Sequence, residues 1–273
     1  MQYDPIKRSL GSFFNRRPVM RKLFYCLLDW LLLRSWHIRK ELRQLKSEGL
    51  YSPLIFDAGS GFGQYSYRMA MMFPKATIVA ADIKPEQIDD CNGFFNKIGL
   101  SDRVHFQLAD LTQYSAKEKY DLVISVDVME HIEEDRKVFQ NFCVSMKPGG
   151  VLLISTPSDQ GGSDSHDHDH EEGAHGFIDE HVRDGYNIRE IEKKLMTAGF
   201  KKVEARYSYG WPGNLSWKVS MKYPILMLGT SRCFFMILPF YYLVTFPISI
   251  VLNYLDININ HKTGTGLIVK ATK

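Results

Sequence analysis

The chain has 273 residues, with 34 Lys and Arg against 31 Asp and Glu, and a formal net charge of +3. The length is sufficient for one α/β domain with additions, and the small net charge argues against nucleic acid as a partner. The four cysteines are widely scattered and form neither a C-x-x-C pair nor a disulfide framework, as expected in a reducing cytoplasm.

The N-terminal segment is dense in both cations and large apolar residues. Between residues 13 and 45, Leu, Phe and Trp residues accompany many Arg and Lys residues. This composition predicts a basic amphipathic helical segment within residues 1–50, which would bind a bilayer interface that contains anionic lipid. An ordinary cap helix packed on a sheet fits the same residues, and the sequence leaves both interpretations open.

A glycine-rich turn follows the first predicted strand. The apolar run Leu54–Phe56 ends in Asp57, and a helix is predicted over residues 65–73. Between them stand three glycines at alternate positions, Gly59, Gly61 and Gly63. Strand, glycine turn and helix form the nucleotide-binding element of an open α/β sheet, where glycine lets the backbone turn sharply and a ligand approach closely.

Two cofactor classes compete for this turn. A dinucleotide site favours G-x-G-x-x-G, but Gln64 stands where its third glycine belongs. Asp57 stands two residues before the first glycine, where a pyrophosphate would be repelled and a cationic ligand tolerated. The turn therefore favours a positively charged cofactor over a nicotinamide dinucleotide.

Acidic residues follow several of the next predicted strands. Short apolar strands are predicted at residues 77–81, 104–108, 120–126 and 151–155. Helical stretches separate them, which predicts a parallel, doubly wound sheet. Four acids fall at the strands' carboxyl ends, where such sheets bind ligands: Asp57, Asp82, Asp110 and Asp127.

The pattern D-x-G-x-G-x-G, together with these acids, resembles the class I S-adenosylmethionine-dependent methyltransferases. Residues 54–156, continuing to about 200, look like the methyltransferase family grouped as type 11, which includes ubiquinone-biosynthesis-type enzymes. The resemblance implies a seven-stranded Rossmann-like sheet with an antiparallel last strand. Residues 202–209 fit the sixth strand and residues 266–271 the seventh, so the core would comprise residues 51–210 and 259–273.

The resemblance also implies S-adenosylmethionine as the cofactor and a set of residues that bind it. The glycines would border its methionine part, Asp82 its ribose, Asp110 and Leu111 its adenine, and Asp127 would lie near the methyl group. The complete predicted set is Asp57, Gly59, Gly61, Gly63, Tyr65, Asp82, Ile83, Asp110, Leu111 and Asp127.

Two histidines are candidates for a catalytic base. A hydroxyl acceptor has to lose a proton on methylation, and histidine accepts protons near neutral pH. His181 precedes a predicted helix at residue 188, and His131 follows Asp127 in the family's fourth-strand motif. Structural roles for both, as a loop anchor and at a helix start, stay open, because an amine or carbanion acceptor requires neither.

A histidine- and acid-rich stretch occupies residues 164–175. Its alternating His and Asp residues lack the fixed spacing of a structural zinc site, so no metal is predicted. The default interpretation is a polar loop after the fifth strand, and binding of a divalent metal by this loop stays open.

An apolar insertion at residues 211–258 separates the sixth and seventh predicted strands. Residues 233–252 carry no charge and are long enough to span a membrane. One crossing would place two strands of one sheet on opposite sides of the bilayer. Pro239 and Pro247 are expected to interrupt a helix, which predicts a broken helical pair that enters or lies on the membrane. The alternative is a buried lid or a dimer face.

These features together predict a methyltransferase that acts on an apolar, lipid or lipid-linked acceptor. It would be cytoplasmic and peripherally or monotopically associated with the membrane. The alternatives are a methyltransferase of a soluble small molecule or protein, an NAD-dependent oxidoreductase, and a non-enzymatic membrane adaptor. The sequence predicts neither the acceptor, nor the methylated atom, nor the oligomeric state.

Overall fold

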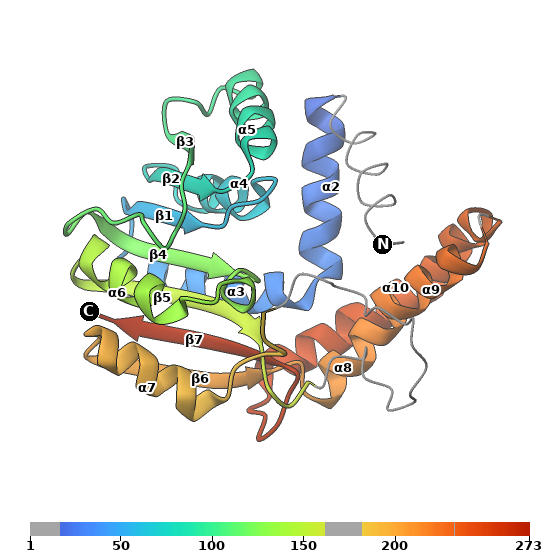
Figure 1. Cartoon of the computed structure of the whole chain (residues 1–273). Coiled ribbons are helices and arrows are strands. Elements are labelled where there is room, and N and C mark those ends of the chain that lie inside the picture. The colour runs from blue at the N-terminus through green and yellow to red at the C-terminus, as the bar shows by residue number, and fades with distance from the viewer. Residues whose placement is uncertain (1–16, 162–181, 232) are drawn as a thin grey trace. The chain divides into compact units, whose positions relative to one another are not determined.

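The computed structural model describes residues 17–161, 182–231 and 233–273 (Figure 1). Its centre is a seven-stranded sheet of order β3-β2-β1-β4-β5-β7-β6. The strands are β1 Leu54–Ala58, β2 Thr77–Asp82, β3 Val104–Leu108, β4 Tyr120–Val126, β5 Met146–Pro157, β6 Lys202–Ser208 and β7 Gly266–Thr272.

Strands β1 to β5 run parallel, and their inner residues form the core. β1 pairs with both β2 and β4, so that Phe56 lies between Val79 and Val123 in register. Burial on both faces explains why these strands read as continuous apolar runs.

The last strand runs against the others (Figure 1). The backbone N–H of Gly149, near the start of β5, donates to the carbonyl of Lys273 at the end of β7 (3.1 Å), and Lys273 donates back to Gly150 (3.1 Å). The predicted doubly wound sheet with an antiparallel last strand is confirmed.

Helices alternate with the strands and have ordinary end signals. Pro85 begins α5, and Asn187 caps α7 by accepting a hydrogen bond from the Arg189 N–H (3.0 Å). The helices are α2 Pro18–Leu31, α3 Leu33–Ser47, α4 Gln64–Met72, α5 Pro85–Lys97, η1 Met129–His131, α6 Asp135–Ser145, α7 Ile188–Ala198, α8 Trp211–Trp217, η2 Lys218–Lys222, α9 Tyr223–Thr230 and α10 Phe234–Asn258.

Strand β5 begins five residues earlier than its predicted start at Val151. Tyr120 of β4 pairs with Met146, but Leu122 pairs with Val151, so the Lys147–Gly150 turn forms an irregularity inside the strand. β4 and β5 pair both before and after this turn, because its residues fold out of the ladder of hydrogen bonds, as in a β-bulge.

The chain divides into two compact units, each with its own interior. The described part of unit 1 comprises residues 17–41, 160–161 and 207–266 without residue 232. The described part of unit 2 comprises residues 42–159, 182–206 and 267–273, and it contains the glycine turn and strands β1 to β5.

The insertion in unit 1 forms a helical hairpin. One arm consists of α8, the π-helical turn η2 and α9, and α10 returns beside it (Figure 1). The hydroxyl groups of Tyr241 and Tyr242 donate to the carbonyls of Val219 (2.7 Å) and Ser220 (2.8 Å), which joins the two arms. The predicted return of the chain is therefore seen.

The expectation that Pro239 and Pro247 interrupt a helix is wrong. Both lie inside α10, which is one helix of 25 residues, and the chain turns instead between the end of α9 at Thr230 and the start of α10 at Phe234. A proline removes one hydrogen bond and crowds the preceding turn, but it can kink a helix without ending it. The two tyrosine hydroxyl bonds hold the stretch between the prolines in place.

Candidate functional site: a cofactor cradle at the ends of the strands

The glycine turn is tied to the end of strand β2. The N–H groups of Gly59 and Ser60 both donate to the carbonyl of Ala81 (2.9 Å each), and the Gly61 N–H donates to the Asp82 carboxylate (2.8 Å). Gly59 has φ of +78°, and a Cβ there would lie 2.3 Å from Val128 Cγ2. Only glycine fits this position, because any side chain would strain the backbone and collide with the start of η1.

Asp57 lies beneath this turn and is 2% exposed. Its carboxylate accepts a hydrogen bond from the Ser66 hydroxyl of α4 (2.5 Å). Burial raises the pKa of Asp57 to about 7, and the nearby charge of Asp82 adds to the effect, whereas the Ser66 hydrogen bonds oppose it. A buried carboxyl with this pKa is a candidate for pairing with a cationic ligand group.

Asp82 ends strand β2 and holds the backbone on both sides of itself. One carboxylate oxygen accepts from Gly61, and the other accepts from the Lys84 N–H (3.0 Å). Each carboxylate oxygen can accept a second hydrogen bond, so Asp82 can also bind hydroxyl groups. Asp82 and the glycine turn therefore lie at the same end of the sheet, and their predicted contacts with the cofactor stay a prediction.

Two apolar side chains are exposed at adjacent strand ends. Ile83 follows β2 and is 65% exposed, and Leu108 ends β3 and is 60% exposed. β2 and β3 are neighbours, with Asp82 in register with Leu108. Together they offer an apolar surface for a flat aromatic ring. Ile83 was among the predicted cofactor-binding residues, whereas Leu108 was predicted only as the last residue of a strand.

The remaining predicted cofactor residues differ in their surroundings. Asp110 is exposed, and one of its carboxylate oxygens accepts from the Thr112 N–H and hydroxyl (2.8 Å each). Leu111 is buried, and Tyr65 lies half-buried in the first turn of α4. Asp110 therefore shapes a turn through this one carboxylate oxygen.

Asp127 follows strand β4 in a strained conformation. Its φ of +52° is in the left-handed region, which non-glycine residues rarely adopt, and its N–H donates to the Ser155 carbonyl (2.9 Å). Such strain is concentrated at functional sites. His131 lies four residues later, at the end of η1, and is half-exposed.

The residues at these strand ends fit S-adenosylmethionine. Among the described residues, the hydroxyl of Ser60 in the glycine turn is buried without a hydrogen-bond partner, which is unusual unless a ligand supplies one. Two carboxyl groups, Asp57 and Asp82, match a cationic amino acid and a ribose. Ile83 and Leu108 match an adenine ring.

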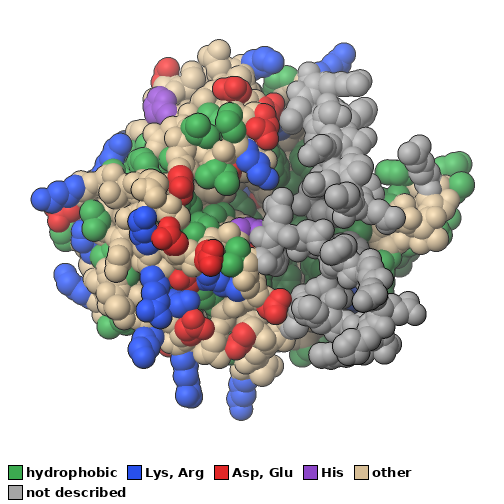
Figure 2. All heavy atoms as spheres, viewed as in Figure 1, with side chains coloured by type: hydrophobic (Ala, Val, Ile, Leu, Met, Phe, Trp, Pro, Cys, Tyr) green, Lys and Arg blue, Asp and Glu red, His purple; other side chains and the backbone are tan. Residues whose placement is uncertain are grey.

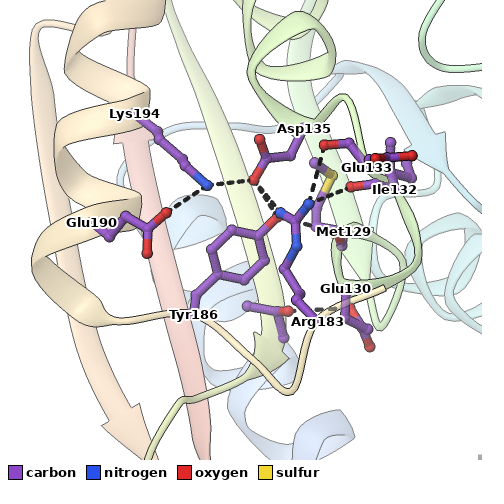
Figure 3. A network of polar contacts seen from close by, with 10 residues as sticks. Met129, Glu130, Ile132, Glu133, Asp135, Arg183, Tyr186, Glu190 and Lys194 are labelled. Carbon is purple, nitrogen blue, oxygen red and sulfur yellow. Dashed lines mark hydrogen bonds and ion pairs between the residues drawn. The ribbon is translucent and has the colours of Figure 1, made fainter. Parts of the chain in front are cut away.

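A polar network lies beside this site and was not assigned from the sequence (Figure 3). The Asp135 carboxylate of α6 accepts hydrogen bonds from Arg183, from the Tyr186 hydroxyl (2.9 Å) and from Lys194 of α7 (2.8 Å). Burial alone would raise the pKa of Asp135, but hydrogen bonds from Lys194 and Tyr186 and the charge of Arg183 hold it below its ordinary value. The carboxylate therefore stays ionised at neutral pH.

The network fixes the segment that follows residue 181. Arg183 also donates to the carbonyl of Ile132 (2.7 Å), and the Val182 N–H donates to the carbonyl of Glu130 (3.1 Å). Glu130 is buried and accepts from the Thr156 hydroxyl (3.1 Å). The sequence neighbours of the two candidate bases, Val182 and Glu130, are thus joined. His181 itself lies outside the described residues.

The histidine- and acid-rich stretch at residues 164–175 also lies outside the described residues. Within the described ranges, no group of three or more His, Cys, Asp or Glu side chains is placed to hold a metal ion.

Comparison with known proteins identifies the family. The model of a methyltransferase domain family matches residues 54–199, more than half of the chain. A malonyl-[acyl-carrier protein] O-methyltransferase of Ilyobacter polytropus is 30% identical over 37% of this chain and 38% of its own. A ubiquinone biosynthesis O-methyltransferase of Actinobacillus pleuropneumoniae is 28% identical over 44% of this chain and 52% of its own.

Solved structures agree on the fold. The Haemonchus contortus phosphoethanolamine N-methyltransferase 2, in complex with S-adenosyl-L-methionine, matches with a TM-score of 0.59 and 18% identity, covering 86% of this chain and 52% of that one. The chain spans between about a third and a half of the length of the relatives named here. The glycine turn, the acids at the strand ends and the family match lead to one conclusion: the chain belongs to the methyltransferase domain family, whose cofactor is S-adenosylmethionine.

Proposed function

We propose that this protein transfers the methyl group of S-adenosylmethionine to an apolar, lipid or lipid-linked acceptor at a membrane surface. The observation that carries the proposal is the exposed apolar surface of α10. Among the described helices it alone is long and apolar enough to cross a membrane. Its most apolar window of 18 residues has a mean hydropathy of 2.0, and 11% of that window is buried.

An exposed surface of this kind requires an apolar partner. The core helix of a soluble protein reaches similar hydropathy but is mostly buried, and α10 is not. Each square ångström of apolar surface removed from water contributes about 25 cal/mol, so contact with lipid would stabilise the helix substantially. Figure 2 shows hydrophobic side chains at the surface where α9 ends and α10 begins, at the right of the view.

The place of the hairpin in the chain supports an apolar acceptor. Residues 211–258 are inserted between β6 and β7, two neighbouring strands of the sheet. The relative named for ubiquinone biosynthesis supports an acceptor of this class, because ubiquinone is a lipid.

The described residues suggest how the cofactor is held. Asp57 would face the cationic methionine end, Asp82 the ribose hydroxyls, and Ile83 with Leu108 the adenine ring. The glycine turn keeps this space clear of side chains. When bound, S-adenosylmethionine would supply an electrophilic methyl group: the acceptor's nucleophilic atom would bond to the methyl carbon in line, and the cofactor's sulfur would leave as a neutral thioether.

The protein's own contribution to the chemistry is orientation, exclusion of water and acceptance of a proton. Transfer from a sulfonium disperses positive charge, so a dry and well-oriented site helps most. For a hydroxyl acceptor, an imidazole nitrogen of His181 or His131 would take the proton. The hydrogen bond from Val182 to Glu130 and the network around Asp135 would hold both segments in place.

The proposal is tested by methylation of a lipid extract. The purified chain is incubated with methyl-labelled S-adenosylmethionine and lipid extract dispersed in detergent, and products are separated into organic and aqueous phases for mass analysis. A labelled lipid-soluble product is expected. Label confined to a water-soluble molecule or a protein would contradict the proposal and favour the soluble-acceptor alternative.

A further inference from the structure

We propose that unit 1 is a monotopic membrane module, which docks on one leaflet of an anionic bilayer through two apolar stripes. This inference rests on the proposed function and specifies its partner and its mode of binding. The α2 stripe consists of Val19, Leu23, Leu27 and Trp30. The α10 stripe consists of Met236, Phe240, Leu243, Val244, Ile248, Val251 and Leu255.

Helix α2 buries polar side chains and exposes apolar ones, which is the reverse of the pattern in an ordinary cap helix. Its buried side chains are Arg21, Tyr25 and Asp29, each four residues apart. Arg21 donates to the Tyr25 hydroxyl (2.7 Å), and Arg39 of α3 donates to the Asp29 carbonyl (3.2 Å). Three polar side chains of this helix, Arg21, Tyr25 and Asp29, therefore face the interior of unit 1.

The opposite face of α2 is apolar and exposed. Val19 is 75% exposed and Leu23 is 50% exposed, and Leu27 and Trp30 continue the stripe at helical spacing. In a soluble protein the apolar face of such a helix packs inward.

Helix α10 repeats this inversion at its C-terminal half. Ser249, Asn253 and Asp256 are buried, at spacings of four and three residues. Ser249 and Asn253 face α8, where the Ser216 hydroxyl donates to the Asn253 side chain (2.7 Å). The exposed side is apolar along the whole helix, with Met236 79% and Leu243 76% exposed.

Asp256 is the centre of this polar interior. Its carboxylate lies 2.9 Å from His37 Nε2 and 3.0 Å from His261 Nε2, and it accepts hydrogen bonds from the N–H groups of Tyr209 (3.1 Å) and Gly213 (3.0 Å). Both Asp256 and His37 are fully buried. A polar interior within an apolar exterior is the arrangement of helices that lie in lipid, where ionisable residues face inward and pair.

The charges around the stripes select an anionic surface. Residues 5–28 include six Lys and Arg and no Asp or Glu, and residues 211–255 include three Lys and Arg and no acid. Of these cations, Arg17 and Lys22 are exposed on α2, and Lys218 and Lys222 are half-exposed on η2. Each cation near an anionic leaflet contributes about 1 kcal/mol.

The length of the hairpin argues against a crossing. The first arm carries Lys218 and Lys222, and its apolar part is α9, Tyr223–Thr230, with 8 residues. At about 1.5 Å per residue this part is ~12 Å long, less than half of a hydrocarbon core of ~30 Å. Both arms also lead into β6 and β7 of one sheet. The tip therefore enters one leaflet only.

Vesicle flotation tests the partner. The full chain is mixed with phosphatidylcholine vesicles, with or without phosphatidylserine, at low and high salt. We expect flotation with the anionic vesicles that weakens with salt. The double variant Leu23→Glu/Leu27→Glu should bind more than roughly tenfold more weakly, because it places two charges in the α2 stripe.

A matched control separates the stripe from a general effect of added charge. The double variant Val144→Glu/Met196→Glu also introduces two glutamates, but at exposed apolar positions of unit 2. It should float like the wild type. The inference would be overturned if both double variants lost vesicle binding equally, or if the wild type did not float with anionic vesicles. A stable dimer that the α2 variant dissociates without any change in vesicle binding would also overturn it.

The native cysteines test the depth of insertion. Cys26 and Cys233 are exposed, whereas Cys91 and Cys143 are buried, so Cys26→Ser leaves Cys233 near the hairpin tip as the reactive thiol among them. With anionic vesicles, Cys233 should be protected from an impermeant maleimide added outside and stay unlabelled by the same reagent enclosed in the lumen. Labelling from the lumen would show a crossing, and unchanged labelling from outside would show that the hairpin does not insert.

These results are separable from the proposed function. Methylation of lipid extract in detergent needs no bilayer. A chain that methylates the extract but does not float disproves the inference alone, and a chain that floats but labels no lipid disproves the proposed function alone.

Discussion

At the scale of single residues, Asp57 links the cofactor site to pH. Its pKa of about 7 exceeds the ordinary value of 3.8, since burial penalises the ionised carboxylate. The folded state therefore holds a proton that the unfolded chain has released, and stability falls as pH rises from the ordinary value through about 7. A shift of this size corresponds to about 4 kcal/mol.

Replacement of this carboxyl group gives the first prediction. Asp57→Asn should unfold at a higher temperature than the wild type above pH 7, because no buried charge forms. It should also bind S-adenosylmethionine roughly ten- to a hundredfold more weakly at pH 8, by loss of a charge-assisted interaction. Titration calorimetry across pH should show wild-type affinity falling below about pH 7.

The control for this prediction is Asp89→Asn, at an exposed acid of α5. It should leave both the melting temperature and the affinity near the wild-type values. An Asp57→Asn variant with unchanged affinity and unchanged pH dependence would show that this carboxyl does not face the cofactor.

The second prediction concerns the catalytic base. If the acceptor is a hydroxyl, His181→Gln or His131→Gln should lower kcat by about 10²- to 10⁴-fold without changing the affinity for S-adenosylmethionine. Initial rates on the methylated lipid fraction measure the effect. His105→Gln, at an exposed position of β3, is the matched control. Near-normal turnover in both site variants would refute the assignment.

At the scale of elements, the best sequence-based predictions are those of strands and helix ends that local patterns determine. Strands β2, β3 and β4 match their predicted bounds to within one residue, because short β-branched apolar runs bounded by turn residues have few alternatives. Pro85 gave the start of α5 for the same reason. The glycine turn and the strand-end acids could likewise be read from spacing alone.

Features that depend on distant contacts could not be predicted. Pro239 and Pro247 stay inside α10 because tyrosines between them bond to a facing π-helical turn, which no local pattern announces. From the sequence, Arg183 is indistinguishable from a surface cation, because its partner Asp135 is 48 residues away in the chain. The buried polar face of α2 was hidden because Arg21 and Asp29 appear as ordinary solvent-facing charges.

The third prediction concerns the polar centre of unit 1. Asp256→Ala should destabilise this unit by about 3 to 5 kcal/mol, because it removes a buried carboxylate that lies against His37 and His261 and accepts hydrogen bonds from two backbone N–H groups. Thermal unfolding followed by tryptophan fluorescence measures the effect, since Trp30, Trp36, Trp211 and Trp217 all lie in unit 1. Asp102→Ala, an exposed acid of unit 2, should have little effect.

The pH dependence of this centre has a definite sign. Burial by itself raises the pKa of Asp256, but the hydrogen bond and charge of His37 and the charge of His261 lower it below the ordinary value. The stability contributed by the ionised carboxylate is therefore present above the ordinary aspartate pKa and is lost as pH falls through the lower, folded-state value. An acid transition that is identical in Asp256→Ala and the wild type would contradict this account.

At the scale of the whole molecule, the methyltransferase unit is conventional and the helical unit is not. Unit 2 carries the glycine turn, the strand-end acids and strands β1 to β5, and the family match to residues 54–199 gives the reaction class. Unit 1 carries polar groups inside and apolar stripes outside. The proposal of an apolar acceptor therefore rests on unit 1 and not on the family match.

The most direct test of this account compares hairpin variants on membranes. Phe240→Ser/Leu243→Ser/Val244→Ser changes exposed side chains of α10 in unit 1, whereas the proposed cofactor residues belong to unit 2. The wild type and this variant are incubated with membranes and methyl-labelled S-adenosylmethionine, and the label is partitioned between organic and aqueous phases. We predict organic-phase label with the wild type and a loss of more than roughly tenfold with the variant, at unchanged cofactor affinity. Equal organic-phase labelling by both proteins, or label in the aqueous phase alone, would contradict a methyltransferase that works at a membrane surface.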